Sequence, residues 1–231
     1  MMLNCWAYTT AGRRTENQDS VSLPGIGLLA DDTITSISMD LSSTPLLVAI
    51  ADGVGGRPMG QWAAQTALTT LETVGLDENS PQAVASIIAR ASKALSERAG
   101  NGAGPATTLA GISVTRDALL RFHVGDSRIY ELRENSVRSI TSDHRSRGDG
   151  RSITRYLGSD AHAIPSITIM ATPFTSTYLI SSDGFHGFLR ESDLLLVAEI
   201  DPPLALETLF SIALENGSDD NLSAVIVRID A

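Results

Sequence analysis

Residues 46–56 read LLVAIADGVGG, so an apolar run of strand length ends in a carboxylate and a glycine-rich segment. The run predicts a buried β-strand, because aliphatic residues fill it and turn-forming residues follow it. A carboxylate at the end of a buried strand is costly unless it is paired or bound to a cation. Asp52 is therefore a candidate functional residue at a strand end.

Two further aspartates stand beside predicted strands. Asp183 follows the run TYLISS at 177–182 and precedes Gly184, and Asp220 lies just before the run LSAVIVRI at 222–229. A single Asp-Gly pair is typical of a tight turn. Three carboxylates beside strand ends favour a different interpretation, in which these strand ends converge on one site.

The predicted site offers hard oxygen ligands, which suit Mg²⁺ or Mn²⁺ rather than zinc with its preference for His and Cys. Gly53, Gly55 and Gly56 lack a Cβ, so the backbone there can turn sharply and bring a carbonyl close to an ion. These residues predict a divalent-metal site, but they do not identify a reaction.

The predicted strands come in clusters and the predicted helices in pairs. Strands are predicted at 3–9, 45–51, 107–115, 118–124, 127–133, 166–171, 177–182 and 222–229. Helices are predicted at 59–75, at 80–98 with Ser80 as N-cap, and at 203–216 between Pro203 and Gly217. This pattern favours an α+β layered fold over a doubly wound parallel sheet. The short connections at 116–117 and 134–135 predict antiparallel hairpins.

Composition and charge disfavour several classes of protein. Hydrophobic residues make up 42% of the 231 residues and charged residues 19%, which is typical of a globular chain with a sizeable core. No apolar run reaches the roughly 18 residues of a membrane span, and the N-terminus does not resemble a signal peptide. We therefore expect a cytoplasmic protein without a membrane partner. The net charge of −10 disfavours a nucleic-acid partner. Cys5, the single cysteine, excludes an intrachain disulfide and is expected to be buried in the first strand.

Six short blocks follow one another between residues 14 and 221. They are Arg14-Thr15-Glu16-Asn17-Gln18-Asp19, Asp52-Gly53-Val54-Gly55-Gly56, Ala106-Thr107-Thr108, Val124-Gly125-Asp126-Ser127-Arg128, Ser182-Asp183-Gly184 and Asp219-Asp220-Asn221. Each block alone is a weak signal, and six in this order are a strong one. On these residues the chain resembles the metal-dependent serine/threonine protein phosphatases of the PPM (type 2C) family, in its bacterial form.

The resemblance implies one phosphatase domain over residues 1–231. Its implied fold is a four-layer αββα sandwich, in which two antiparallel sheets are flanked by helices. It also implies two Mn²⁺ or Mg²⁺ ions bridged by Asp52. Asp183 and Asp220 would hold one ion, and the backbone carbonyl of Gly53 would help to hold the other.

The implied reaction is hydrolysis of phosphoserine and phosphothreonine monoesters by a water or hydroxide that bridges the two ions. Arg14 would bind the substrate phosphate through its guanidinium fork, and Asp19 would act beside the metals through water. The implied partners are a phosphorylated protein substrate and an opposing serine/threonine kinase. Two alternatives stay open. One is a weak or inactive relative that binds a phosphoprotein or a regulator. The other is a phosphodiesterase or nuclease using the same carboxylates, which the acidic composition disfavours.

The chain departs from the family pattern at two positions beside this site. Val54 stands where some members have a histidine able to protonate the leaving group. Gly187 stands where the family usually has an acidic residue, which forms a third metal site with the aspartate at the position of Asp126. We therefore expect a third ion to be lost or weakly bound, with Asp126 in a lesser role or only capping a turn. His186 is a candidate substitute ligand.

A further departure is the short connection after Asp143, where many bacterial members carry a mobile flap. Three of its residues, at 145, 147 and 151, are arginines that could meet a phosphopeptide or a partner, and the alternative is a solvated loop. We expect Arg13 to lie on the surface, and His123 and His144 to have no catalytic task.

Overall fold

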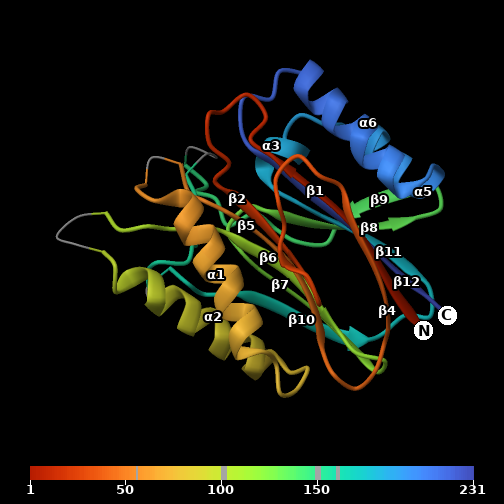
Figure 1. The fold of residues 1–231 in the computed structure, drawn as a ribbon, viewed down its shortest axis with the longest axis horizontal. Helices are drawn as coiled ribbons and strands as arrows, with labels where there is room; N and C mark the ends of the chain where they lie inside the picture. The colour runs from red at the N-terminus through yellow and green to blue at the C-terminus, as the bar shows by residue number, and fades with distance from the viewer. Residues whose placement is uncertain (56, 100–102, 149–151, 160–161) are drawn as a thin grey trace.

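The computed structural model describes the whole chain except residues 56, 100–102, 149–151 and 160–161. Its described residues form two antiparallel sheets of six strands each (Figure 1). The first sheet contains, in spatial order, β4 (Thr35–Asp40), β1 (Met2–Thr10), β12 (Leu222–Asp230), β11 (Ser176–Ser181), β8 (Arg128–Arg133) and β9 (Ser136–Ser139). The second contains β10 (Ser166–Ala171), β7 (Ala118–Val124), β6 (Leu109–Val114), β5 (Leu46–Asp52), β2 (Asp19–Leu23) and β3 (Gly27–Leu28).

The two sheets pack face to face through apolar side chains. In β1, every second residue is buried, so that Leu3, Cys5 and Ala7 join the core between the sheets. Val48 and Ile50 of β5 meet them from the second sheet. Successive residues of a strand point to opposite faces, which explains the alternation in β1. The apolar surface buried here is the main stabilising term of the sandwich.

Helices cover the outer face of each sheet, on opposite sides of the molecule (Figure 1). On the second sheet lie α1 (Gly60–Val74) and α2 (Pro81–Ser96), which bury Leu68 and Ile88 against it. On the first sheet lie α3 (Asp183–His186), α4 (Glu191–Leu194), α5 (Leu196–Glu199) and α6 (Pro202–Glu215). The expected four-layer αββα sandwich is thereby confirmed.

The sequence-based elements are largely confirmed, with shifts of a few residues at their ends. Ser80 accepts a hydrogen bond from the Ala83 amide and caps α2 as predicted. The hairpins expected at 116–117 and 134–135 are the pairs β6–β7 and β8–β9. The helix expected to open at Pro203 starts one residue earlier, at Pro202. Strands β2, β3, β4 and β9 and the short helices α3, α4 and α5 were not predicted.

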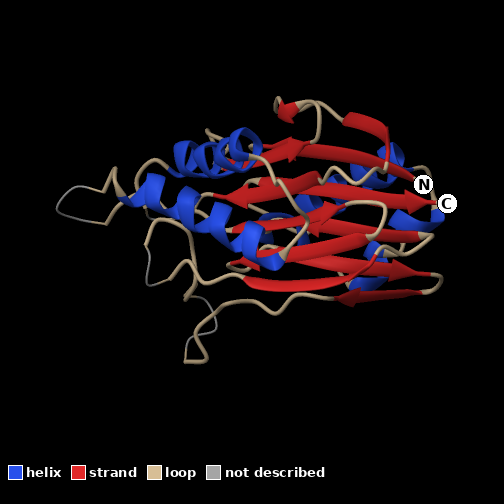
Figure 2. Cartoon of the chain, turned by 90° about the horizontal axis from the view of Figure 1, so that it is seen from below, coloured by secondary structure: helices blue, strands red, loops and turns tan. Residues whose placement is uncertain are grey.

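The strand ends opposite the chain termini contain the candidate site residues beside β12. Both termini lie together at one end (Figure 2), where Met2 pairs with Asp230. At the other end of the same pair, Thr10 is opposite Leu222. Asp220 lies two residues before that end of β12. Among the described residues, the structure has no helix with the length and apolarity of a membrane span.

Candidate functional site

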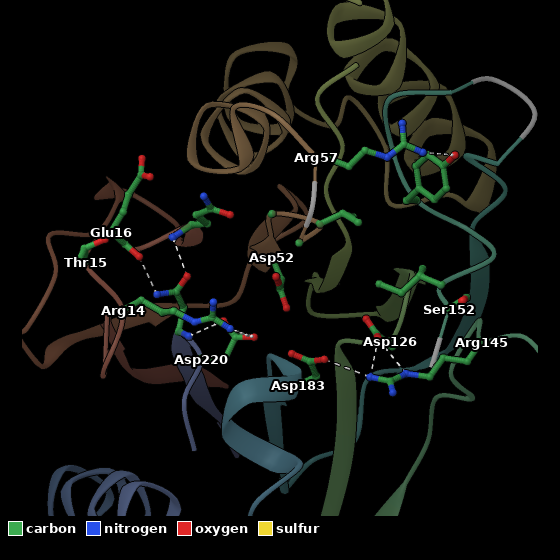
Figure 3. Close-up of a pocket in the computed structure, with 17 residues that line it drawn as sticks. Arg14, Thr15, Glu16, Asp52, Arg57, Asp126, Arg145, Ser152, Asp183 and Asp220 are labelled. Carbon is green, nitrogen blue, oxygen red and sulfur yellow. Dashed lines mark hydrogen bonds and ion pairs between the residues drawn. The ribbon is translucent and has the colours of Figure 1, made fainter. Parts of the chain in front are cut away.

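A cleft of about 680 Å³ opens at this end of the two sheets (Figure 3). Its charged lining combines four aspartates and one glutamate with three arginines, namely Asp52, Asp126, Asp183, Asp220, Glu16, Arg14, Arg57 and Arg145. The aspartates come from both sheets, so the expected convergence of strand ends is confirmed. Asp19 is buried behind this lining, directly opposite Asp52 in the β2–β5 register.

Asp52 is the last residue of β5, and its backbone is held by the block that follows α2. The Asp52 amide donates to Thr108 Oγ1 at 3.1 Å, and its carbonyl accepts from the Thr108 amide at 2.8 Å. Thr107 Oγ1 donates to the same carbonyl at 2.8 Å. These bonds give Thr107 and Thr108 a structural role that their place in the motif did not reveal: they fix the direction in which the Asp52 carboxylate leaves the strand.

The backbone segments that carry Asp183 and Asp220 approach each other closely because Gly184, which follows Asp183, has no side chain. Asp183 is the first residue of α3, and Gly184 follows it. A Cβ on Gly184 would lie 2.1 Å from the Asn221 carbonyl oxygen and 3.0 Å from Asp220 Cβ. Only glycine lets the start of α3 approach the start of β12 this closely. Gly184 is thus required because a larger residue would collide with the backbone of Asn221.

Arg14 lies at the rim of the cleft beside Asp220. Its Nη2 is 3.3 Å from Asp220 Oδ2, and the side chains of both residues are about half exposed. Asn221 holds the neighbouring loop: its Nδ2 donates to the carbonyls of Ala11 and Glu16, and its Oδ1 accepts from the Gln18 amide. Asn221 therefore positions Arg14, a task that the motif alone did not show.

Arg145 lies on the far side of the cleft and contacts two of the aspartates (Figure 3). Its Nη2 is 2.6 Å from Asp126 Oδ2 and 3.1 Å from Asp183 Oδ2, and its Nε donates to Asp126 Oδ2 at 2.9 Å. From the sequence, this arginine was a candidate for contact with a phosphopeptide or a partner. The structure instead directs it into the carboxylate cluster. Arg147 is exposed, and Arg151 lies outside the described residues.

Burial and mutual repulsion raise the pKa values of the clustered carboxyl groups. Burial, opposed in part by hydrogen bonds from Ser182 and Ser223, raises the pKa of Asp19 to about 7. The pKa of Asp52 is raised well above its usual range, first by burial and then by the charge of Asp19. Burial raises the pKa of Asp126 to about 6, although Arg145 opposes the shift. Cations are the natural partners of such a cluster.

The donor set fits hard divalent cations. Asp19 Oδ2 and Asp126 Oδ1 are buried without a hydrogen-bond partner, and buried carboxylate oxygens are costly in that state. Within the described part of the chain, no three His, Cys, Asp or Glu side chains are drawn together closely enough to enclose an ion. The ion pairs explain this spacing, because Asp220 leans toward Arg14 while Asp183 leans toward Arg145.

The three histidines near the site are engaged in structural contacts. His123 and His144 stack with ring centroids 4.4 Å apart, and His144 Nδ1 accepts from the Gly125 amide. His186 is buried, with Nδ1 3.1 Å from Ser181 Oγ, and burial lowers its pKa to about 3. His186 does not line the cleft, so a role as substitute ligand gains no support from its position. Gly187 ends α3 and supplies no ligand side chain.

Arg57 also lines the cleft, and the sequence analysis did not identify it as a candidate. Its Nη2 donates to the hydroxyl of Tyr156 at 3.0 Å, and its guanidinium lies 5.1 Å from the centre of that ring. Arg57 follows the glycine-rich segment, and Tyr156 belongs to the short connection after Asp143. No spacing in the sequence pairs these two residues. Val54 also lines the cleft.

Comparison with known sequences identifies the family. A sequence model described as protein phosphatase 2C matches residues 25–226. The chain belongs to the protein phosphatase 2C family.

Curated bacterial phosphatases are similar over most of this chain. The serine/threonine protein phosphatase PstP of Mycobacterium tuberculosis is 28% identical over 213 residues, which is 79% of this chain and 40% of the relative. The chain thus spans less than half the length of that relative. The protein phosphatase PhpP of Streptococcus pneumoniae is 23% identical, over 80% of this chain and 86% of the relative.

Solved structures of other type 2C phosphatases share the fold. The crystal structure of the serine/threonine phosphatase Stp1 from Staphylococcus aureus superposes with a TM-score of 0.81 at 23% identity, covering 100% of this chain and 96% of that chain. The Mycobacterium tuberculosis PstP/Ppp structure gives a TM-score of 0.78 at 24% identity, with 100% of both chains covered. These likenesses extend the family assignment to the architecture of the whole sandwich.

Proposed function

We propose that this chain is a metal-dependent protein phosphatase that hydrolyses phosphoserine and phosphothreonine monoesters. The observation that carries the proposal is the cleft itself. Asp52, Asp183, Asp220 and Asp126 line it together, and Arg14 lies at its rim beside Asp220 (Figure 3). A phosphate monoester requires positive charge, and a carboxylate cluster that takes up divalent cations can supply it beside a guanidinium fork.

In this proposal two Mn²⁺ or Mg²⁺ ions bind at Asp52. Asp183 and Asp220 would hold one of them, and the carbonyl of Gly53 would help to hold the other. When bound, such ions offset the charge of the phosphoryl oxygens and activate water for attack on phosphorus. Asp19, buried behind Asp52, favours cation binding through its negative charge and through a water-mediated contact.

The remaining groups of the cleft bind and orient the substrate. Arg14 is half exposed at the rim, so its guanidinium is free to exchange Asp220 for a phosphoryl group with two parallel hydrogen bonds. Asn221 holds the loop that carries Arg14 and so fixes its approach. The described residues of the cleft place no cysteine beside Asp52, and Cys5 is buried in the sheet core with its pKa raised by burial. The mechanism therefore uses no thiolate nucleophile.

The relatives bear on the substrate class. PstP is named as a serine/threonine protein phosphatase and PhpP as a protein phosphatase, and a protein carrying phosphoserine or phosphothreonine is accordingly the proposed substrate. A serine/threonine kinase would supply that substrate. The openness of a cleft lined by polar groups is consistent with an extended peptide.

The test is hydrolysis of p-nitrophenyl phosphate and of a phosphothreonine peptide by the purified chain, with EDTA, Mg²⁺ or Mn²⁺. We expect turnover that requires the metal and falls by roughly 10³-fold or more in Asp52→Asn. Asp40→Asn, an exposed aspartate at the end of β4, is the matched control. Silence with every metal from a folded protein would instead favour an inactive relative that binds a phosphoprotein. Activity on a bis-ester without activity on the phosphopeptide would favour a phosphodiesterase.

A further inference from the structure

The carboxylates of the cleft are divided between two environments. On one side, Asp220 and Asp52 face the open cleft and Arg14 (Figure 3). On the other, Asp126 is buried, with its side chain 1% exposed, and is in contact with Arg145. Asp183 lies between the two sides and touches Arg145 through one oxygen, Oδ2. The buried carboxylate Asp126 therefore has a positive partner, Arg145, within the protein itself.

Arg145 meets Asp126 with the geometry of a strong ion pair. Two of its nitrogens, Nε and Nη2, approach the same oxygen at 2.9 and 2.6 Å. Nη2 then bridges to Asp183 at 3.1 Å. The guanidinium is always charged, and it donates in a planar fork that suits carboxylates at such spacing. Its side chain is only 28% exposed, so solvent weakens the pair little.

The backbone that carries Arg145 is held in place beside Asp126. The His144 amide donates to the Gly125 carbonyl at 2.9 Å, and the Gly125 amide donates back to His144 Nδ1 at 3.0 Å. On the other flank, the Thr154 amide and hydroxyl both donate to the His144 carbonyl. Arg145 itself forms a β-bridge with Ile153. These contacts tie the residue before the arginine to the residue before the aspartate.

A competing partner for the guanidinium is already occupied. Asp143, two residues before Arg145, receives Arg128 through two hydrogen bonds of 2.8 Å, one to each carboxylate oxygen. Its distance to Arg145 Nε is 3.8 Å. Arg145 is thus directed toward Asp126 and Asp183 rather than toward its nearest acidic neighbour in the sequence.

We propose that Arg145 is a built-in cation of the cleft, which pairs with Oδ2 of Asp126 and Oδ2 of Asp183 and confines divalent ions to Asp52, Asp220 and the other oxygen of Asp183. The guanidinium balances the charge of Asp126 although Asp126 Oδ1 has no hydrogen-bond partner of its own among the described residues. Arg145 is a positioning residue in this scheme. It holds Asp183 in place for its ion and keeps Asp126 from becoming a metal ligand. Where a third ion would otherwise be needed to neutralise Asp126, the protein carries a fixed positive charge. The inference rests on the proposed metal site, and it adds which carboxylates that site excludes.

A consequence concerns the protein without metal. An arginine fixed between two partly or fully buried carboxylates stabilises the metal-free fold, because removing it leaves Asp126 buried and unpaired. Arg145→Ala should therefore lower the Tm in EDTA by several degrees and should create a place for one more Mn²⁺ per chain. Arg145→Lys retains the charge without the guanidinium fork, so its Tm in EDTA should lie between those of wild type and Arg145→Ala.

The experiment is Mn²⁺ titration by calorimetry and equilibrium dialysis on the full chain, together with Tm in EDTA, for wild type, Arg145→Ala, Arg145→Lys, Asp126→Asn and the Arg145→Ala/Asp126→Asn pair. Arg147→Ala, an exposed arginine two residues away, is the control and should match wild type throughout. We expect Asp126→Asn alone to leave the Mn²⁺ stoichiometry unchanged. We expect Arg145→Ala to gain one weaker ion, which the double variant loses again.

Two results would overturn the proposal. One is the loss of an ion in Asp126→Asn, since Asp126 would then be a ligand despite Arg145. The other is wild-type stoichiometry and Tm in Arg145→Ala. Neither measurement uses phosphatase activity, so an inactive chain that shows the expected stoichiometries would refute the proposed function and leave this inference standing. If Arg145→Ala fails to fold, the Asp126→Asn titration and the Arg145→Lys stability decide the matter.

Discussion

Asp19 of β2 and Asp52 of β5 lie directly opposite each other in an antiparallel pair. Cross-strand neighbours of like charge destabilise a sheet. Here Asp19 is also buried, while Asp52 lines the cleft. Burial raises the pKa of Asp19 to about 7, and burial together with the charge of Asp19 raises the pKa of Asp52 well above its usual range. The pair makes the end of the sheet unfavourable without cations and receptive to them.

Asp19→Asn tests this relationship. The folded-state pKa of Asp19 lies above its unfolded value of 3.8, so its contribution to stability is complete below about pH 4 and is lost as pH rises toward about 7. In EDTA at pH 8 the variant should be more stable than wild type by about 1–3 kcal/mol. Urea unfolding at pH 5 and pH 8 measures the difference.

The same variant should bind Mn²⁺ more weakly, by roughly tenfold or more, because the ions lose a neighbouring charge. Calorimetric titration measures this affinity, with Asp40→Asn as the control for the loss of one surface charge. A more stable metal-free protein with undiminished Mn²⁺ affinity would contradict the role assigned to Asp19.

Arg14 and its neighbour Arg13 provide a matched pair for substrate binding. Arg14 lines the cleft, whereas Arg13 donates to the Leu214 carbonyl at 2.7 Å in the last turn of α6. Arg14→Ala should raise KM for a phosphothreonine peptide about tenfold or more, and Arg14→Lys should recover only part of the loss. Arg13→Ala should leave KM unchanged and lower the free energy of unfolding by about 0.5–1 kcal/mol. Equal effects of the two substitutions on KM would argue against phosphate binding by Arg14.

The partly buried ring of His144 predicts a pH dependence of stability. Its ring is stacked on His123 and faces Arg155, while Asp143 opposes their effect, and its pKa is lowered to about 4, mainly by burial. The unfolded chain binds this proton near pH 6.5, so stability from His144 is present above that pH and is lost as pH falls toward 4.

The measurement is the difference in unfolding free energy between wild type and His144→Asn from pH 7.5 to pH 4.5, with Mn²⁺ held at saturation. Asparagine keeps an acceptor for the Gly125 amide but does not titrate, so the advantage of wild type should shrink as the pH falls. A difference that stays constant over this range would show that His144 does not protonate on unfolding.

The architecture could be predicted from the sequence wherever one face of an element is apolar. Strands β7 and β10 begin and end at the predicted residues. Strand β2 was missed because it reads DSVSL: both of its faces are buried, and its serines give no alternation. Its buried serines depend on distant residues, as in the bond between Ser22 and Glu72 of α1. No local pattern contains such a partner.

Some residues of the candidate site could likewise be predicted from the sequence, and others could not. The carboxylates at strand ends could be predicted because Asp52, Asp183 and Asp220 each stand next to a recognisable strand. Arg145 could not be assigned, since its partners Asp126 and Asp183 are 19 and 38 positions away in the chain. The direction of a side chain in an irregular connection depends on backbone contacts such as those of His144. Its ion pairs therefore become visible only in three dimensions.

Gly53 and Gly55 belong to the same glycine-rich segment but differ in the space around them. A Cβ on Gly53 would lie 2.6 Å from the Gly60 carbonyl carbon and 2.7 Å from Gly60 Cα, whereas a Cβ on Gly55 would meet no atom within 4 Å. Neither glycine has a positive φ among the described residues, so the requirement at Gly53 is space for the start of α1 rather than a left-handed turn.

Gly53→Ala should therefore push the start of α1 away from β5, because backbone atoms, unlike a flexible side chain, cannot step aside cheaply. We expect a loss of about 2–4 kcal/mol in unfolding free energy, comparable with overpacking elsewhere in a core, and a large loss of activity with Mn²⁺ as the Gly53 carbonyl moves. Gly55→Ala should stay within about 0.5 kcal/mol of wild type. Urea unfolding and p-nitrophenyl phosphate turnover, measured on both variants, test the contrast. If Gly55→Ala were the more damaging substitution, the segment would need backbone freedom at that residue, and contact with α1 would not be the reason for glycine here.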